Sequence, residues 1–285
     1  MPDSGDTVLR AITNDGAFRV VVARTTDTVR GAFKAQHASG KTAFCFGDLL
    51  TGSVLFRETM APDLRVQGIL RGARGAGSLV ADSHPSGMTR GLIQLPRNGN
   101  EVDMGAGAML QLMRTLPGGR INQGVVQIPE GGDVSHGLMA YMQTSEQVVS
   151  MVAVGTLIDE GEVVAAGGYL VQLLPEVGRG PLLVMTERLR DFENIDAQLR
   201  DSSFSPAWLL EQLLYGMEYT QLDERSIGFD CWCDELRLIA ALTTLSREDI
   251  EDLLSSGQTL EISCDYCGKE YRIAPSKLQG LVQSS

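Results

Sequence analysis

Cys231-Trp232-Cys233, within GFDCWCDELR, and Cys264-Asp265-Tyr266-Cys267, within ISCDYCGKEY, hold four of the five cysteines of this 285-residue chain. Four thiolates bind zinc tetrahedrally, and two short loops that each supply two sulfurs meet that geometry at low cost in chain entropy. Gly268 directly follows the second pair and suits a tight turn that needs a positive φ. The sequence therefore predicts one zinc ion per chain, bound by Cys231, Cys233, Cys264 and Cys267.

The rest of the sequence favours a reducing environment for these cysteines. The N-terminal segment MPDSGDTVLR lacks the basic and apolar regions of a secretory signal, and no apolar run approaches the ~18 residues of a membrane span. We expect a soluble cytoplasmic protein with no membrane partner, and there clustered cysteines favour metal binding or redox sensing over structural disulfides. The fifth cysteine, Cys45, lies alone in the apolar segment AFCFGDLL and is expected to be a packed core thiol.

Charge distribution bears on two alternative functions. The net charge is −12, and residues 181–285 hold 19 acidic and 9 basic side chains, against 17 and 15 in residues 1–180. An acidic C-terminal part is poorly suited to phosphate backbones, so a zinc-ribbon nucleic-acid-binding protein is an alternative that the charge disfavours. A thiol-disulfide oxidoreductase is the other alternative, and it would need its Cys-x-x-Cys at a helix N-terminus in a thioredoxin-like fold.

Hydrophobic periodicity predicts an α+β fold for the N-terminal part. Turn residues and β-branched runs predict a hairpin within 7–30, split by Asn-Asp-Gly, and apolar residues recur at helical spacing in 31–60. Residues 64–128 are expected to be rich in strands, and 133–147 to form a helix with Asp133 as its N-cap. Two further strands are expected at 150–174, turning at 159–161.

The pattern changes after residue 180. Apolar spacing is helical from Pro181 to about Gly216, with an interruption at Pro206, and we expect a helical linker over residues 178–228. The linker would join an N-terminal α+β domain, 1–177, to a small four-cysteine zinc domain, 229–285. Inside that last domain we expect an amphipathic helix at 234–245, a second helix with Ser246 as its N-cap, and a short hairpin at 259–274.

No constellation of catalytic residues stands out, and we expect no enzyme activity. The glycine-rich segment Gly72-Ala-Arg-Gly75-Ala-Gly77 lacks the Lys-Ser/Thr of a phosphate-binding loop and is expected to be a turn between strands. The three histidines, His37, His84 and His136, lack the spacing of metal ligands.

Several motifs together resemble one family, the redox-regulated heat-shock holdase of thirty-three kilodaltons. The Cys-x-Cys and Cys-x-x-Cys pairs after a helical linker resemble its C-terminal part, down to CDYCGKEY. The N-terminal part carries three further segments that look like family motifs: Tyr141 with Ser145-Glu146-Gln147, Gln172-Leu173-Leu174-Pro175, and Gln123-Gly124-Val125-Val126. One departure is local, because Asp234 stands where family members often carry a small hydroxyl residue.

The resemblance implies an ATP-independent chaperone that holds unfolding client proteins during oxidative stress. The reduced protein would bind Zn²⁺ and be inactive. Oxidation would pair Cys231 with Cys233 and Cys264 with Cys267, release zinc, unfold the zinc domain and linker, and so activate binding of unfolded client proteins. The family also implies a homodimer in the oxidised state.

Overall fold

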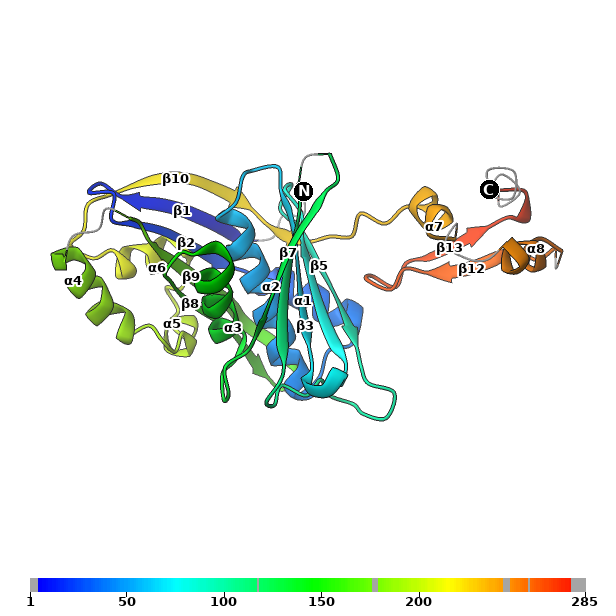
Figure 1. Ribbon diagram of the computed structural model, residues 1–285, viewed down its shortest axis with the longest axis horizontal. Coiled ribbons are helices and arrows are strands. Elements are labelled where there is room, and N and C mark those ends of the chain that lie inside the picture. Colours follow the sequence, from blue (N-terminus) through cyan, green and yellow to red (C-terminus); the bar gives the residue numbers. More distant parts are fainter. Residues whose placement is uncertain (1–4, 117, 176–178, 243–246, 256, 278–285) are drawn as a thin grey trace. The chain divides into compact units, whose positions relative to one another are not determined.

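A computed structural model of the chain describes residues 5–116, 118–175, 179–242, 247–255 and 257–277. The chain divides into two compact units, Met1–Asp230 and Cys231–Ser285. The first unit holds one antiparallel sheet, one sheet that is antiparallel apart from its edge strand β11, and most of the helices, so the α+β class predicted from the sequence is confirmed (Figure 1). Within the described residues, no helix has the length and apolar character that crossing a membrane requires.

One sheet has five antiparallel strands in the order β10-β1-β2-β9-β8. The strands are β1 (Thr7–Thr13), β2 (Phe18–Arg24), β8 (Ser150–Asp159), β9 (Glu162–Leu173) and β10 (Tyr219–Ser226). The predicted hairpin joins β1 and β2, and Gly16 in its turn has a φ of 70°. Strand β2 is buried on both faces, which indicates that the sheet is covered on two sides.

The second sheet has six strands in the order β11-β5-β4-β3-β6-β7. Its strands are β3 (Arg65–Arg71), β4 (Ser78–Ser83), β5 (Met88–Gln94), β6 (Met109–Thr115), β7 (Ile121–Gln127) and β11 (Gly228–Phe229). The predicted strand-rich region supplies five of the six. Strand β11 comes from the end of the unit and pairs parallel to β5. Between β3 and β4 the glycine-rich segment forms a short 3₁₀ turn, Ala73–Gly75, as expected.

Three helices pack the two sheets together: α1 (Thr26–Gln36), α2 (Gly40–Glu58) and α3 (Val134–Tyr141). Helix α2 contacts strands of both sheets and is buried along most of its length, as its nearly uniform apolar character requires (Figure 1). Asp133 caps α3 as predicted, because its carboxylate accepts a hydrogen bond from the backbone N–H of His136 at 3.0 Å. A π-helical turn, Met142–Glu146, extends α3 to the end of the predicted helix.

Helices α4 (Arg179–Arg190), α5 (Asp196–Leu199) and α6 (Pro206–Leu213) cover the other face of the five-stranded sheet. Together with that face they form a second apolar core, to which the helices and the residue before α5 contribute Met185, Ile195, Leu199, Leu209, Leu210 and Leu213. Pro206 begins α6 rather than breaking a helix, and Ser205 caps it by accepting a hydrogen bond from the N–H of Trp208 at 3.2 Å. The predicted linker thus packs on the N-terminal sheet over this stretch.

The structure differs from the predicted linker at its C-terminal end, where residues 219–226 form strand β10 instead of helix. The strand pairs antiparallel to β1, with a bulge opposite Arg10 and Ala11. Its anchor is an ion pair, because a guanidinium nitrogen of Arg10 lies 2.7 Å from a carboxylate oxygen of Asp223. In this edge strand, YTQLDERS, the apolar Leu222 stands among polar and charged residues and is 52% exposed, so apolar alternation does not mark the strand in the sequence.

The second unit holds α7 (Glu235–Leu242), α8 (Arg247–Ser255), β12 (Leu260–Ser263) and β13 (Glu270–Ile273). Strands β12 and β13 pair antiparallel and confirm the hairpin predicted at 259–274. The amphipathic helix predicted at 234–245 corresponds to α7. The proposed N-cap, Ser246, lies outside the described residues. Among the residues of this unit whose burial the structure describes, Ile250, Cys264 and Ile273 are the buried ones, so this described part has little apolar core of its own.

Candidate metal centre

The first cysteine pair lies in the segment that leads into α7. Cys231 and Cys233 are both half-buried, and Asp234 follows them immediately. The Asp234 carboxylate accepts a hydrogen bond from the backbone N–H of Arg237 at 2.8 Å, which is the contact of a helix N-cap. Asp234 therefore begins α7 directly after the second cysteine and fixes where the chain leaves the site. Asp234, the local departure noted in the sequence, thus has a structural role.

The second pair occupies the turn between β12 and β13. The backbone N–H of Gly268 donates to the carbonyl oxygen of Cys264 at 2.8 Å, and the N–H of Cys267 lies 3.3 Å from the same oxygen. Gly268 has a φ of 71°, in the left-handed region that a residue with a Cβ rarely adopts. The turn therefore has the conformation that the sequence predicted from the glycine after the cysteine pair, and it brings both sulfurs to one side of the hairpin.

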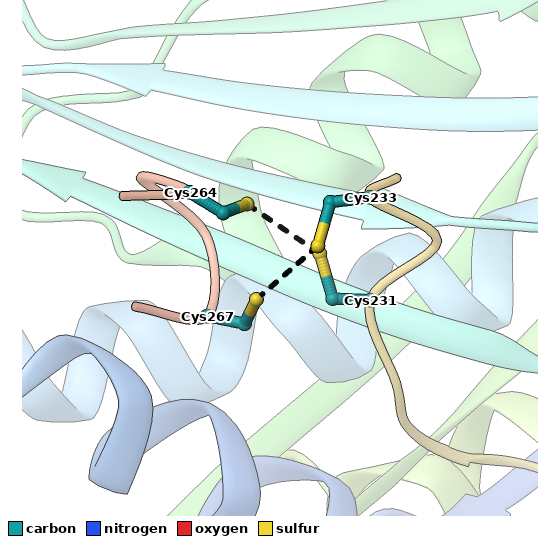
Figure 2. Close-up of side chains that lie close together, drawn as sticks. All are labelled: Cys231, Cys233, Cys264 and Cys267. Atoms are coloured by element: carbon teal, nitrogen blue, oxygen red, sulfur yellow. Dashed lines mark hydrogen bonds between the residues drawn. The ribbon is translucent and has the colours of Figure 1, made fainter. Parts of the chain in front are cut away.

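The four sulfur atoms converge, and all lie within 4.8 Å of one another (Figure 2). The sulfurs of Cys231 and Cys264 are 3.8 Å apart, and those of Cys233 and Cys267 are 3.5 Å apart. Sulfurs about 2.3 Å from a shared tetrahedral ion are separated by about 3.8 Å, so the spacing fits a four-thiolate metal site. Among the described residues this is the one cluster of three or more potential ligands that could hold a metal ion.

The pKa values of two cysteines in the cluster are shifted in opposite directions. Burial acts to raise the pKa of Cys233, but the Tyr271 hydroxyl and the neighbouring thiols donate hydrogen bonds to its sulfur, and the pKa falls below its usual value. Burial raises the pKa of Cys267, and the adjacent Cys233 and Cys231 raise it further. Four negative sulfurs this close repel one another, so a cation is what would allow all four to be thiolates together.

Tyr271 is a residue of this site that sequence reasoning missed. Its hydroxyl lies 3.1 Å from the sulfur and 3.0 Å from the carbonyl oxygen of Cys233. Since it donates to the sulfur, the hydrogen bond raises the pKa of the phenol. The sequence CDYCGKEY places Tyr271 four residues after Cys267. No local sequence pattern indicates that its hydrogen-bond partner is Cys233, 38 positions earlier.

Cys45 takes no part in the cluster. It lies on α2, is half-buried, and packs against the core of the first unit. Burial raises the pKa of the Cys45 thiol to about 11, with a further contribution from the nearby Asp48 and Asp133 carboxylates. A thiol with that pKa reacts slowly with oxidants, because the thiolate is the nucleophile. The expectation of a packed core thiol fits this environment.

Sequence comparisons place nearly the whole chain in one family. The family described as "Hsp33 protein" matches residues 6–274. A "33 kDa chaperonin" of Thermus thermophilus is 31% identical over 96% of this chain and 86% of its own length. A "33 kDa chaperonin" of Syntrophotalea carbinolica is 27% identical over 97% of this chain and 99% of its own.

The fold agrees with a solved structure. The crystal structure of a "33 kDa chaperonin (Heat shock protein 33 homolog)" from Thermotoga maritima superposes on this chain with a TM-score of 0.81 and covers 99% of both chains at 22% identity. That likeness concerns the fold alone. Since the family match extends over nearly the whole sequence, including all four clustered cysteines, the chain belongs to the Hsp33 family.

Proposed function

We propose that this chain is an ATP-independent chaperone of the holdase type, which binds unfolding proteins and is controlled by oxidation of its four clustered cysteines. Membership of the Hsp33 family, with relatives named 33 kDa chaperonin, supports the chaperone function. The convergence of Cys231, Cys233, Cys264 and Cys267 is the observation that carries the redox control. The proposal includes a cytoplasmic location, where thiols are kept reduced.

The donor set favours Zn²⁺ as the ion of the reduced protein. Four cysteine sulfurs at this spacing suit a soft, tetrahedral ion, and Cys₄ is a common structural zinc site. Zinc bound there would supply an apparent folding free energy of about 10–16 kcal/mol to the unit that holds it. A unit in which three of the residues with described burial are buried would depend on such an external contribution.

Oxidation removes the ligands by joining them in pairs. We propose disulfides between Cys231 and Cys233 and between Cys264 and Cys267. Each closes a loop of very few residues, which is worth roughly 2 kcal/mol by loop entropy. That is much less than the free energy of metal binding, so the oxidised unit would unfold.

The region α4–α6, in the proposed linker, is the element whose release would expose a surface for clients. It covers apolar side chains of the five-stranded sheet, among them Phe18, Val20 and Tyr169. Its attachment is weak in places: only Met185 of α4 is buried, while Leu183 is 70% exposed. A cleft of about 280 Å³ also lies between α4 and the sheet. An incompletely packed cover over an apolar sheet suits a part that opens on activation.

The two alternative functions receive less support. The Cys-x-x-Cys pair, Cys264 and Cys267, lies in the turn between β12 and β13, so it lacks the helix N-terminus that activates the Cys-x-x-Cys thiols of an oxidoreductase. The excess of acidic residues after residue 180 disfavours nucleic acid as a partner.

The deciding experiment measures zinc content and suppression of client aggregation before and after treatment with peroxide and mild heat. We expect one zinc per chain and no suppression in the reduced protein, and then zinc loss and suppression without ATP after oxidation. Light scattering on both samples tests the proposed homodimer of the oxidised state. A reduced protein without zinc, or an oxidised protein that leaves aggregation unchanged, would exclude the redox-controlled holdase.

A further inference from the structure

The hydroxyl of Tyr271 makes a polar contact with a cysteine sulfur of the cluster. Tyr271 lies on β13, and its oxygen is 3.1 Å from the Cys233 sulfur and 3.0 Å from the Cys233 carbonyl oxygen. A phenol has one proton to donate, so the two acceptors share it. The contact joins the β12–β13 hairpin, which carries Cys264 and Cys267, to the segment that carries Cys231 and Cys233. The acceptor is the sulfur of Cys233.

The ring that carries this hydroxyl is itself held in place. The Lys269 ammonium nitrogen lies 5.1 Å from the centre of the Tyr271 ring, within the range of a cation–π contact. On the opposite strand Ile262 pairs with Tyr271 in register, one residue before the strand ends at Ser263. Ring and hydroxyl are thus positioned by the same hairpin that positions Cys264 and Cys267.

We propose that Tyr271 is a positioning residue that slows the attack of the Cys233 sulfur on peroxide and so sets which cysteine pair is oxidised first. This inference rests on the proposed four-thiolate site. In the proposed four-thiolate site the Cys233 sulfur is already a thiolate, so the hydrogen bond changes the nucleophilicity of the sulfur and not the fraction of thiolate. A thiolate attacks peroxide through a sulfur lone pair, and a hydrogen bond donated to that sulfur draws on the same electron density. The hydroxyl, 3.1 Å from the half-buried sulfur, also occupies one of the directions from which peroxide could reach that sulfur.

The step that Tyr271 slows is a two-electron oxidation. The Cys233 thiolate attacks one oxygen of hydrogen peroxide, the O–O bond breaks, and a sulfenic acid and hydroxide form. The Cys231 thiolate then attacks the sulfenic sulfur, the S–O bond breaks with loss of a second hydroxide, and the disulfide forms. In the first step the negative charge leaves the sulfur, so the hydrogen bond from Tyr271 is weakened in the transition state and its loss accelerates the reaction.

Tyr271→Phe in the full-length reduced protein tests the inference. Tyr266→Phe is the matched control, because it removes a hydroxyl between the two cysteines of the other pair. Both variants and the wild type are exposed briefly to peroxide at one fixed pH, then differentially alkylated and analysed by mass spectrometry for each cysteine pair. The readout is the initial rate for the pair Cys231–Cys233 divided by the rate for Cys264–Cys267. Zinc content and circular dichroism are measured on the same samples.

We expect Tyr271→Phe to keep its zinc and secondary structure and to raise this ratio about fivefold, which corresponds to about 1 kcal/mol in the barrier. Tyr266→Phe should leave the ratio close to the wild-type value. A purely structural role would accelerate both pairs equally and leave the ratio unchanged, and that result would overturn the inference. So would an equal rise in the ratio for Tyr266→Phe.

A second variant decides the case if Tyr271→Phe cannot hold zinc. Lys269→Met keeps the hydroxyl but removes the cation beside the ring, and it should raise the ratio in the same direction by a smaller factor. A ratio unchanged in that variant would then reject the inference. Suppression of client aggregation is measured in a separate assay. A protein that never suppresses aggregation would contradict the proposed function, whereas the ratio of oxidation rates would still test the role of Tyr271.

Discussion

Tyr169 and Phe192 touch in two ways: the Tyr169 hydroxyl donates a hydrogen bond of 3.0 Å to the carbonyl oxygen of Phe192, and their rings meet edge to face. Tyr169 is fully buried in β9 of the five-stranded sheet, whereas Phe192 follows α4. The pair therefore fastens the segment between α4 and α5 onto the sheet. Because a hydrogen bond from a buried side chain contributes about 1 kcal/mol to stability, this contact makes a sensitive point of attachment.

Tyr169→Phe should loosen the segment α4–α6 without disturbing its apolar packing. The ring contact remains, and the lost hydrogen bond costs about 1 kcal/mol. We expect oxidised protein to begin holding clients at a lower temperature, as measured by light scattering of a thermally unfolding client. Tyr215→Phe is the control, because Tyr215 is 78% exposed. Equal onset temperatures for Tyr169→Phe and the wild type would show that this contact does not restrain opening.

Gly155→Ala should displace α5 from the sheet. A Cβ at residue 155 would lie 2.8 Å from Cγ2 of Ile195 and 3.0 Å from Cδ1 of Leu199, so these buried side chains must give way, and we expect α5 to move with them. We expect partial holding of clients by the reduced variant while its zinc content is unchanged. Gly180→Ala is a control in the same region, because its Cβ would meet nothing within 4 Å. A folded, reduced Gly155→Ala protein that leaves client aggregation at the wild-type level would separate α5 from activation.

Cys264→Ser should weaken zinc binding by more than roughly 100-fold, because it removes a ligand. Removal of a residue that only hydrogen-bonds to a ligand typically lowers metal affinity by about 10–100-fold. Competition with a chromogenic chelator measures the affinity. Cys45→Ser is the internal control: its sulfur packs against the core of the other unit, so some stability is lost but zinc binding and redox activation remain. Full zinc affinity in Cys264→Ser, or failure of activation in folded Cys45→Ser, would refute the assignment of the ligands.

Tryptophan fluorescence should follow activation. Trp208 packs against the second apolar core on α6, and Trp232 is half-buried between Cys231 and Cys233; the chain has no other tryptophan. Peroxide and mild heat should shift the emission to the red as both side chains become hydrated, in step with zinc release and client holding. Trp208→Phe and Trp232→Phe report the two regions separately. Complete activation with an unchanged spectrum would exclude opening of either region.

Asp223→Asn should make the attachment of β10 less sensitive to acid. Hydrogen bonds from Arg225, then Arg10, hold the pKa of Asp223 below its usual 3.8. A lowered folded-state pKa stabilises the fold above the unfolded pKa, and this contribution is lost as pH falls through the folded value. Thermal melts at pH 7 and near pH 3 should therefore show a smaller loss of melting temperature for the variant than for the wild type. Equal losses would show that Asp223 is not coupled to folding.

Local patterns predicted most of the architecture. Alternating β-branched residues and an Asn-Asp-Gly turn are sufficient for the hairpin of β1 and β2, and Asp133 marks the start of α3 because capping is a contact within one turn. Strand β10 was not predicted, since its strand character comes from pairing with β1, more than two hundred residues earlier. The same holds for Tyr271, whose partner is distant in sequence. The cysteine cluster was predictable because a four-thiolate zinc site uses two pairs of cysteines, each closely spaced in the sequence.

Strands β10 and β11 have a consequence for biosynthesis. They lie next to each other in the chain, yet β10 completes the five-stranded sheet at β1, and β11 lies beside β5 in the other sheet. A nascent chain therefore leaves both β1 and β5 as open edges until residues 219–229 have been translated. Open edges invite pairing with other chains, so the last stretch before Cys231 closes two sites of aggregation at once. A chaperone of this architecture is itself vulnerable until translation has passed residue 229.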